Sequence, residues 1–210
     1  MKHLIIFLFV TTSLAAQTKL YVHSEAKKYV ENTKTIAILP LVVEIKLRPR
    51  ELKEFTQEEI VELGKKEAID IQKAMYSWFL TRKKRGTLLV DVQNPSRTNA
   101  LLKKAGIDIY NYNDLLPSEI GEILGAETIV TGSFETDKPL STGAAIGLAL
   151  LTGGVFTTNT ATLNMDFTST IDDELVVNYL KKVRGSIGSN SEDLINILMR
   201  KVSRRIPYTK

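Results

Sequence analysis

The stretch LLPSEIGEILGAETIVTGSFET, residues 115–136, decides the fold because it joins a short amphipathic helix directly to a buried strand. Ser118 follows Pro117 and is a good N-cap residue. The apolar residues around it recur at helical spacing and predict one apolar helical face: Leu116, Ile120, Ile123 and Leu124. Gly125 suits the left-handed residue that ends a helix. Residues 128–134, TIVTGSF, are uncharged and rich in β-branched side chains, so we predict that they form a central strand.

The composition indicates one ordinary globular domain. The chain has 210 residues, of which 43% are hydrophobic and 25% are charged. The sequence contains no cysteine, which excludes a disulfide, a thiolate metal site and a lipid-carrying cysteine. The formal net charge of +4 is too small to favour nucleic acid as a partner.

Residues 1–16 have the pattern of a secretory signal peptide. A short basic start precedes a continuous apolar run at residues 4–10, and small residues at 13–16 suit a signal peptidase. The apolar run is shorter than the roughly 20 residues that span a bilayer, so we favour a cleaved signal over an uncleaved anchor. We therefore expect an exported protein of the periplasm or the outer-membrane periphery that is not lipid-anchored. Residues 17–34 form a lead-in segment whose structure the sequence does not decide.

We predict a single α/β domain over residues 35–210, in which helices pack on a mixed sheet in the order β-α-β-α-α-β-β-β-α. Besides the central helix and strand, the predicted elements are a strand at 36–43, a long helix at 56–85, a strand at 88–92, a short helix at 97–105, a strand at 162–172, its hairpin partner at 175–186 and a last helix at 189–206.

Local signals support these boundaries. Pro40 cannot donate to a ladder and marks the exit of the first strand or an edge. Thr56 and Glu59 have the spacing of a capping box at the start of the long helix, and Ser96 is the expected cap of the short one. Apolar and polar residues alternate over 162–172, with Ile171 on the inner side, which predicts an antiparallel strand with one solvated face.

This order of elements, with ILPL in the first strand, LGAETIVTGSF at the centre and a long hairpin before the last helix, resembles the amino-terminal domain of TolB and the related CsgG-like periplasmic domains. The matching stretches are residues 36–41, 124–134 and 162–186. The resemblance implies a non-enzymatic envelope domain that binds proteins or assembles at the outer membrane. The sequence departs from these relatives because it has neither the β-propeller that follows the domain in TolB nor the lipid-anchor cysteine of the CsgG-like channels.

We therefore expect a secreted cell-envelope accessory or scaffolding protein that acts by protein–protein contact, with an envelope protein or a second copy of itself as the partner. The alternative is a membrane-inserting, oligomeric subunit of a CsgG-like outer-membrane secretion channel. We expect no enzyme and no cofactor, because His23 is the one histidine after the signal and the common hydrolase, P-loop and zinc motifs are absent. Residues 172–174, Asp-Asp-Glu, fit a hairpin turn better than a cation site.

The most unusual segment is residues 143–156, which is uncharged throughout and lies in an apolar, glycine-rich insertion at 141–158. Such a stretch is buried in its own domain, docks on a neighbour or enters a membrane. We favour docking or self-burial, because the segment lacks the alternation of a barrel strand. In the CsgG-like channels the corresponding kind of excursion forms membrane hairpins, so the resemblance keeps insertion open. The candidate contact residues are Ile146, Leu148, Leu150, Leu151, Val155 and Phe156.

Two further groups are candidates for contacts. The basic run Arg82, Lys83, Lys84 and Arg85 ends the long helix and is a candidate contact for an anionic partner such as lipid headgroups. A solvated helix end that complements the helix dipole is the simpler interpretation. Tyr110 and Tyr112 are candidates for gripping a sugar or a peptide, with loop packing as the favoured interpretation.

Overall fold

The computed structural model describes residues 18–47, 49, 51–137, 160–184 and 191–210. The predicted signal peptide and the contact segment at 143–156 lie outside these residues.

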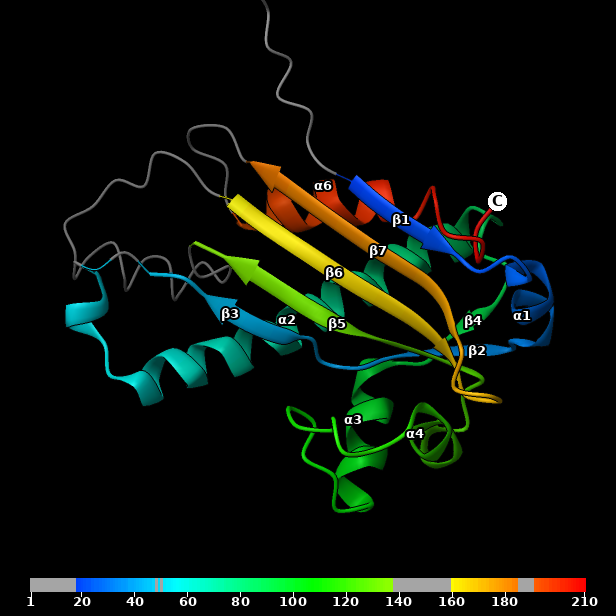
Figure 1. The fold of residues 1–210 in the computed structure, drawn as a ribbon, viewed down its shortest axis with the longest axis horizontal. Helices are drawn as coiled ribbons and strands as arrows, with labels where there is room; N and C mark the ends of the chain where they lie inside the picture. The colour runs from blue at the N-terminus through cyan, green and yellow to red at the C-terminus, as the bar shows by residue number, and fades with distance from the viewer. Residues whose placement is uncertain (1–17, 48, 50, 138–159, 185–190) are drawn as a thin grey trace, which may run out of the picture.

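In the described part of the chain, seven strands form one mixed sheet, seen face-on in Figure 1. The order across the sheet is β1-β7-β6-β5-β2-β4, and β3 also pairs with β5. The strands are β1 Thr18–Val22, β2 Thr35–Ile38, β3 Val42–Ile45, β4 Asp91–Val92, β5 Thr128–Thr136, β6 Thr160–Ser169 and β7 Leu175–Arg184. The predicted α/β class with a mixed sheet is confirmed.

β5 is the central strand, as predicted, because other strands pair along both of its edges. β6 runs antiparallel to it along its whole length, while β2 and β3 lie parallel to its first and last parts. The helix before it, α4 (Pro117–Leu124), ends at Gly125 with φ 63°, which is the left-handed conformation that glycine adopts without strain.

The prediction that Ser118 caps α4 is wrong. The helix begins two residues earlier than a cap at Ser118 would place it, because Pro117 is already helical and needs no hydrogen-bond acceptor for a backbone N–H. Leu116 occupies the N-cap position, and its backbone N–H donates to the Glu119 carboxylate at 2.7 Å. Ser118 instead bonds to the β6–β7 turn.

The predicted strand at 36–43 is split into β2 and β3. Leu39 still donates its N–H to the Val130 carbonyl at 2.9 Å, but Pro40 has no N–H and interrupts the ladder. The chain pairs with β5 again from Val42 onward. The lead-in segment contains β1, which pairs with β7 along all five of its residues, and α1 (Ala26–Asn32).

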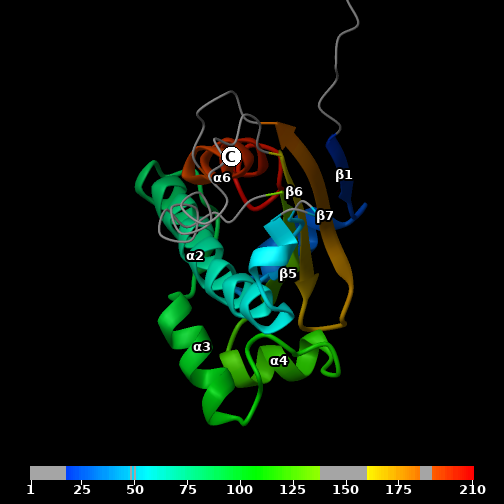
Figure 2. The same ribbon diagram turned by 90° about the vertical axis from the view of Figure 1, so that its left-hand side faces the viewer.

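Two helices cover one face of the sheet, α2 (Gln57–Lys84) and α6 (Ser191–Val202), as Figure 2 shows. The capping box of α2 is confirmed: the Glu59 N–H donates to the Thr56 hydroxyl at 3.2 Å, and the Thr56 N–H donates to the Glu59 carboxylate at 2.8 Å. The main core lies beneath these helices and includes Ile71, Met75, Phe79, Phe134, Phe167 and Tyr179, each at most 1% exposed.

On the opposite face, α3 (Pro95–Lys104) and α4 cover only the end of the sheet where β2 and β5 begin. They enclose a second, smaller core that includes Ala37, Leu39, Leu102, Ile120, Leu124 and Ile129. Asn94, rather than the expected Ser96, caps α3, and its side chain accepts from the Ser96 N–H at 2.8 Å. The strand predicted at 88–92 is reduced to the two residues of β4.

β6 and β7 form the predicted hairpin, whose turn holds Asp173 at φ 60°. Ile171 was expected to point inward, but it is 64% exposed because β6 ends at Ser169 and the residue belongs to the turn. α6 ends at Val202, earlier than expected, although Ile206 beyond it is buried.

Candidate functional site

The sheet has one face that α2 and α6 do not cover, and its centre is polar. Thr131 of β5, Asp166 of β6 and Asn178 of β7 pair in register, so their side chains point to the same side. The Asn178 amide donates to the Asp166 carboxylate at 2.6 Å and to the Asn164 side-chain oxygen at 2.8 Å. We call this surface the open face and define it by Thr131, Ser133, Asn164, Asp166, Thr168 and Asn178.

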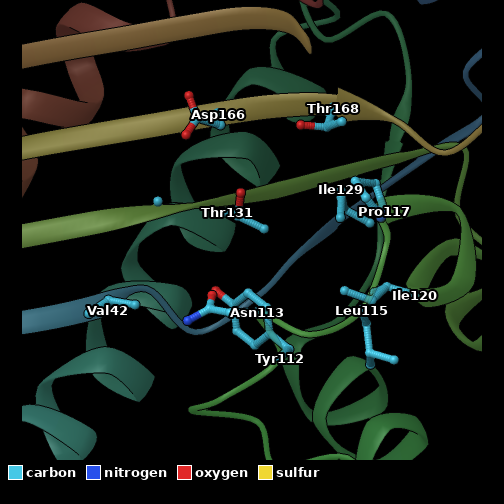
Figure 3. Close-up of a pocket in the computed structure, with 11 residues that line it drawn as sticks. Val42, Tyr112, Asn113, Leu115, Pro117, Ile120, Ile129, Thr131, Asp166 and Thr168 are labelled. Atoms are coloured by element: carbon cyan, nitrogen blue, oxygen red, sulfur yellow. The ribbon is translucent and has the colours of Figure 1, made fainter. Parts of the chain in front are cut away.

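A hollow of about 300 Å³ lies where the open face meets α4 and the loop before it (Figure 3). The sheet provides its floor through Ile129, Thr131, Gly132, Asp166 and Thr168. The loop and α4 provide one wall through Tyr112, Asn113, Leu115, Pro117 and Ile120, and Val42 of β3 provides another side. Walls that are apolar except for Asn113 therefore stand against a floor whose polar side chains are two hydroxyls and one carboxylate.

Gly132 keeps the floor flat. Its φ is +142°, a region that side chains rarely adopt, and a Cβ built on it would lie 2.1 Å from the Asn164 carbonyl oxygen. A glycine therefore lets β5 and β6 approach at this point. Gly132 itself lines the hollow, so this close approach of the two strands shapes its floor.

Tyr112 fixes the wall. Its side chain is 7% exposed, and its hydroxyl donates to the Pro40 carbonyl at 2.8 Å, at the break between β2 and β3. Burial raises the pKa of Tyr112, so it stays a neutral donor. Tyr110 is separate from it: the Lys65 ammonium lies 5.7 Å from the centre of its ring. The two tyrosines therefore pack the loop, which is the interpretation that the sequence favoured.

Exposed apolar side chains flank the hollow and the open face. Val42, which lines the hollow, is 50% exposed, and Leu116, next to Pro117 of the wall, is 57% exposed. Leu175 is paired with Thr168 of the floor and is 36% exposed, while Tyr21 of β1 is paired with Asn178 and is 48% exposed. Exposed apolar side chains therefore lie beside a surface that is rich in hydrogen-bonding groups.

The acidic turn beside the hollow is structural. The Asp173 carboxylate accepts from the backbone N–H of Ser118 at 2.6 Å and from its hydroxyl at 3.0 Å, which ties α4 to the hairpin. The Asp172 carboxylate accepts from the Tyr29 hydroxyl at 2.9 Å. Burial opposes ionisation of Asp172, but hydrogen bonds from Ser169 and Tyr29 outweigh it and lower the pKa of Asp172. In the described ranges, no group of three or more His, Asp or Glu residues is placed to hold a metal ion.

The basic residues that the sequence proposed as contacts are not among the described residues that line this hollow. Arg82 is buried, while Lys83 pairs with Asp91, and Lys84 and Arg85 are exposed. The apolar candidates of the contact segment lie outside the described residues: Ile146, Leu148, Leu150, Leu151, Val155 and Phe156. The channel alternative depends on the same segment, so the described residues do not test it. Within the described part, no helix combines the length and the apolar composition needed to cross a bilayer.

Sequence reasoning missed the hollow, although part of its signal was visible. The alternation over 162–172 placed Asn164, Asp166 and Thr168 on a solvated face, as observed. The loop around Tyr112 approaches that face through contacts between residues distant in sequence, which no local pattern contains.

Comparisons with known proteins show likenesses of fold only. No family model and no curated protein matches the chain. Among solved structures, the PelC dodecamer from Paraburkholderia phytofirmans is similar at 10% identity over 89% of this chain and 94% of that one, with a TM-score of 0.46. Lipoprotein GNA1162 from Neisseria meningitidis is similar at 12% identity over 82% and 95%, with a TM-score of 0.40. The LpoB C-terminal domain from Salmonella enterica is similar at 10% identity over 73% and 82%, with a TM-score of 0.31. With every TM-score below 0.5, these likenesses establish neither a family nor a function.

Proposed function

We propose that the protein is a non-catalytic accessory protein of the cell envelope that binds a protein partner through the open face. The observation that carries this proposal is the hollow, in which mostly apolar walls and a floor with two hydroxyls open onto the part of the sheet face that the described helices leave uncovered. The signal peptide predicted from the sequence of residues 1–16 supports the envelope location.

The size of the hollow supports a protein partner. At about 300 Å³ it lies at the lower end of the range for small-molecule sites. It accommodates one apolar or aromatic side chain, which is how anchors at protein interfaces are usually held. Ser133 and Asn164 beside it offer hydrogen bonds to the polar surroundings of such an anchor.

The carboxylates near the hollow support a binding role over a catalytic one. Among the residues that line it, Asp166 is the one carboxylate, and it is held by Asn178. Asp172 and Asp173 outside it hold the turn and α4. General acid–base chemistry needs titratable groups that converge on one reacting atom, and these three carboxylates serve separate structural bonds.

Site-specific photocrosslinking in the protein's own cells tests the proposal. A photoreactive amino acid at Ser133 or at Leu116 is expected to give one discrete adduct with another protein. The matched control is the same amino acid at Lys103, which is exposed on α3. Equal adducts at all three positions, or none at Ser133 and Leu116, contradict the proposal.

A blocking variant gives a second readout. Thr131→Arg places a long side chain in the hollow and is expected to abolish the adduct at Leu116. Its thermal unfolding, followed by circular dichroism, separates loss of binding from loss of fold. If the adduct persists while the variant folds normally, the hollow is not the binding site.

A further inference from the structure

β1 lies at an edge of the sheet, and within the described residues no strand pairs along its outer side (Figure 1). Along its inner side it pairs with β7 over all five of its residues, without a register shift. Its sequence, TKLYV, contains no proline. Bulges and prolines are common devices that keep an edge strand from pairing with another chain. β1 has neither, so its regular backbone is available for a further strand.

The other end of the strand order is different, because the chain itself bonds along it. β4 has only two residues. Just before it, the Leu89 N–H donates to the Tyr208 carbonyl at 3.0 Å, and the Lys210 N–H donates to the Thr87 carbonyl at 2.8 Å. A strand from outside therefore has less free backbone to pair with at β4 than at β1.

One hydrogen bond fixes the direction of the backbone groups in β1. The His23 N–H donates to the Val176 carbonyl at 2.9 Å, and these two residues continue the register of β1 with β7. In an antiparallel pair, residues that bond to the neighbouring strand alternate with residues whose N–H and C=O groups point away from it. The outward-pointing residues of β1 are therefore those at odd spacing from His23: Thr18, Leu20 and Val22.

The side chains of β1 are also exposed, and on both faces of the sheet. Leu20 and Val22 are each 40% exposed. The β7 residues opposite them, Tyr179 and Val177, are fully buried beneath the helices. Tyr21 points to the other face and is 48% exposed. A further strand beside β1 would cover apolar surface on both faces while its backbone bonds to the outward-pointing groups.

We propose that β1 pairs antiparallel with β1 of a second copy of this chain, about a two-fold axis at Leu20. Leu20 then faces Leu20 of the second copy, Thr18 faces Val22, and the outward-pointing groups form about six hydrogen bonds. Lys19, the one charged residue of the strand, faces Tyr21. An axis at Lys19 would instead place two ammonium groups opposite each other, which is unfavourable. An axis at Tyr21 would pair a shorter part of each strand.

A second copy fits this edge because the strand complements itself. Two-fold pairing uses the β1 edge of both copies and stops at a dimer. β7 of the two copies would lie three strand spacings apart, about 14 Å. That distance leaves room for both α6 helices, which pack on β7 and need about 8–10 Å between their axes. The two open faces would lie on the same side of one continuous sheet and stay uncovered, so the pairing is independent of their proposed function.

Disulfide trapping in the protein's own cells tests the register, because the sequence contains no cysteine. Leu20→Cys places two thiols in a directly opposed pair with Cα atoms about 5.5 Å apart, within reach of a disulfide. We expect oxidation to give a reducible product of twice the mass of the chain. The controls Lys19→Cys, on the same strand, and Leu80→Cys, on α2, are exposed and should give little of it. Co-expressed chains with Lys19→Cys and Tyr21→Cys should join to each other.

Leu20→Pro tests the hydrogen bonds while leaving the ladder to β7 intact. It removes an N–H that points outward, whereas the control Tyr21→Pro removes one that points to β7 and should lower the melting temperature. In analytical ultracentrifugation we expect the wild type to dimerise. We expect Leu20→Pro to raise the dissociation constant of the dimer about 30-fold, because each copy loses one donor.

Each contrary result is specific. A wild type that sediments as a monomer overturns the proposal, as does a Leu20→Cys product no more abundant than that of Leu80→Cys. An undiminished dimer of Leu20→Pro with a normal melting temperature also overturns it, because the contact between copies then lies elsewhere. A discrete disulfide between Leu20→Cys and another protein overturns self-pairing and assigns the β1 edge to a strand of that protein.

Discussion

Gly132→Ala tests the account of the hollow's floor most directly. The new Cβ would lie 2.1 Å from the Asn164 carbonyl oxygen and 3.1 Å from the Met165 Cα, so β5 and β6 have to move apart by about 1 Å to reach ordinary van der Waals contact. All three nearest atoms, which include the Asn164 carbonyl carbon at 2.9 Å, belong to the backbone, which cannot rotate away as a side chain does.

The expected cost has two parts. Holding alanine at φ +142° costs about 1–3 kcal/mol. Separating the strands weakens at least one ladder hydrogen bond, at about 1 kcal/mol. The sum is roughly 3 kcal/mol, which lowers the melting temperature of a protein of this size by about 6–12 °C. Thermal unfolding followed by circular dichroism measures it.

Gly64→Ala is the matched control, because it makes the same chemical change inside α2. Its Cβ would lie 3.1 Å from the Val43 carbonyl oxygen, a tight contact that opposes the gain in helix propensity of about 1 kcal/mol. We expect its melting temperature to stay within about 4 °C of the wild type. If Gly132→Ala also melts within about 2 °C of the wild type, the floor does not depend on this close approach and the reasoning is refuted.

Three further predictions follow from the contacts around the hollow. Asp173→Ala removes both hydrogen bonds from Ser118 and leaves alanine at positive φ, so chemical denaturation should show that the free energy of unfolding falls by about 2 kcal/mol. Asp173→Asn should lower it less, because asparagine tolerates this conformation and keeps an acceptor. The Asp172 carboxylate raises the pKa of Tyr29 to about 12. Since this folded pKa lies above the ordinary 10.0, the contribution of the pair to stability is present below pH 10 and is lost as pH rises toward 12. In an ultraviolet titration, Asp172→Asn should shift the Tyr29 transition down toward 10, and an unchanged transition would contradict the assignment. Tyr112→Phe leaves a buried carbonyl without its donor and should cost about 1–2 kcal/mol in chemical denaturation, whereas no cost would show that the hydroxyl does not hold the wall.

The open face is exposed because of how the helices are distributed over the two sides of the sheet. α2 and α6 carry long apolar stripes and bury the face that holds Phe134 and Phe167. α3 and α4 are short and reach only the beginning of β5. The remainder, against which none of the described helices packs, is polar, as is usual for a sheet face that is not buried.

Local sequence determined the elements whose signals lie within a few residues. The capping box of Thr56 and Glu59, the left-handed end of α4 at Gly125 and the alternation of β6 were all predicted and are all observed. Each depends on interactions between neighbours along the chain, and such interactions are readable as spacing. The class of the fold follows from them, because alternating helices and buried strands have few ways to pack.

Tertiary structure decided the features that depend on distant partners. Ser118 looks like a helix cap, yet Asp173 engages it, 55 residues along the chain. Arg82 belongs to a solvated run in the sequence, yet the packing of α6 buries it against Ser203, 121 residues away. The hollow likewise needs Tyr112 to reach the Pro40 carbonyl across 72 residues. Spacing along a chain records which side chains share a face, but it does not record which surface that face meets, so the hollow on the open face became visible only in the folded molecule.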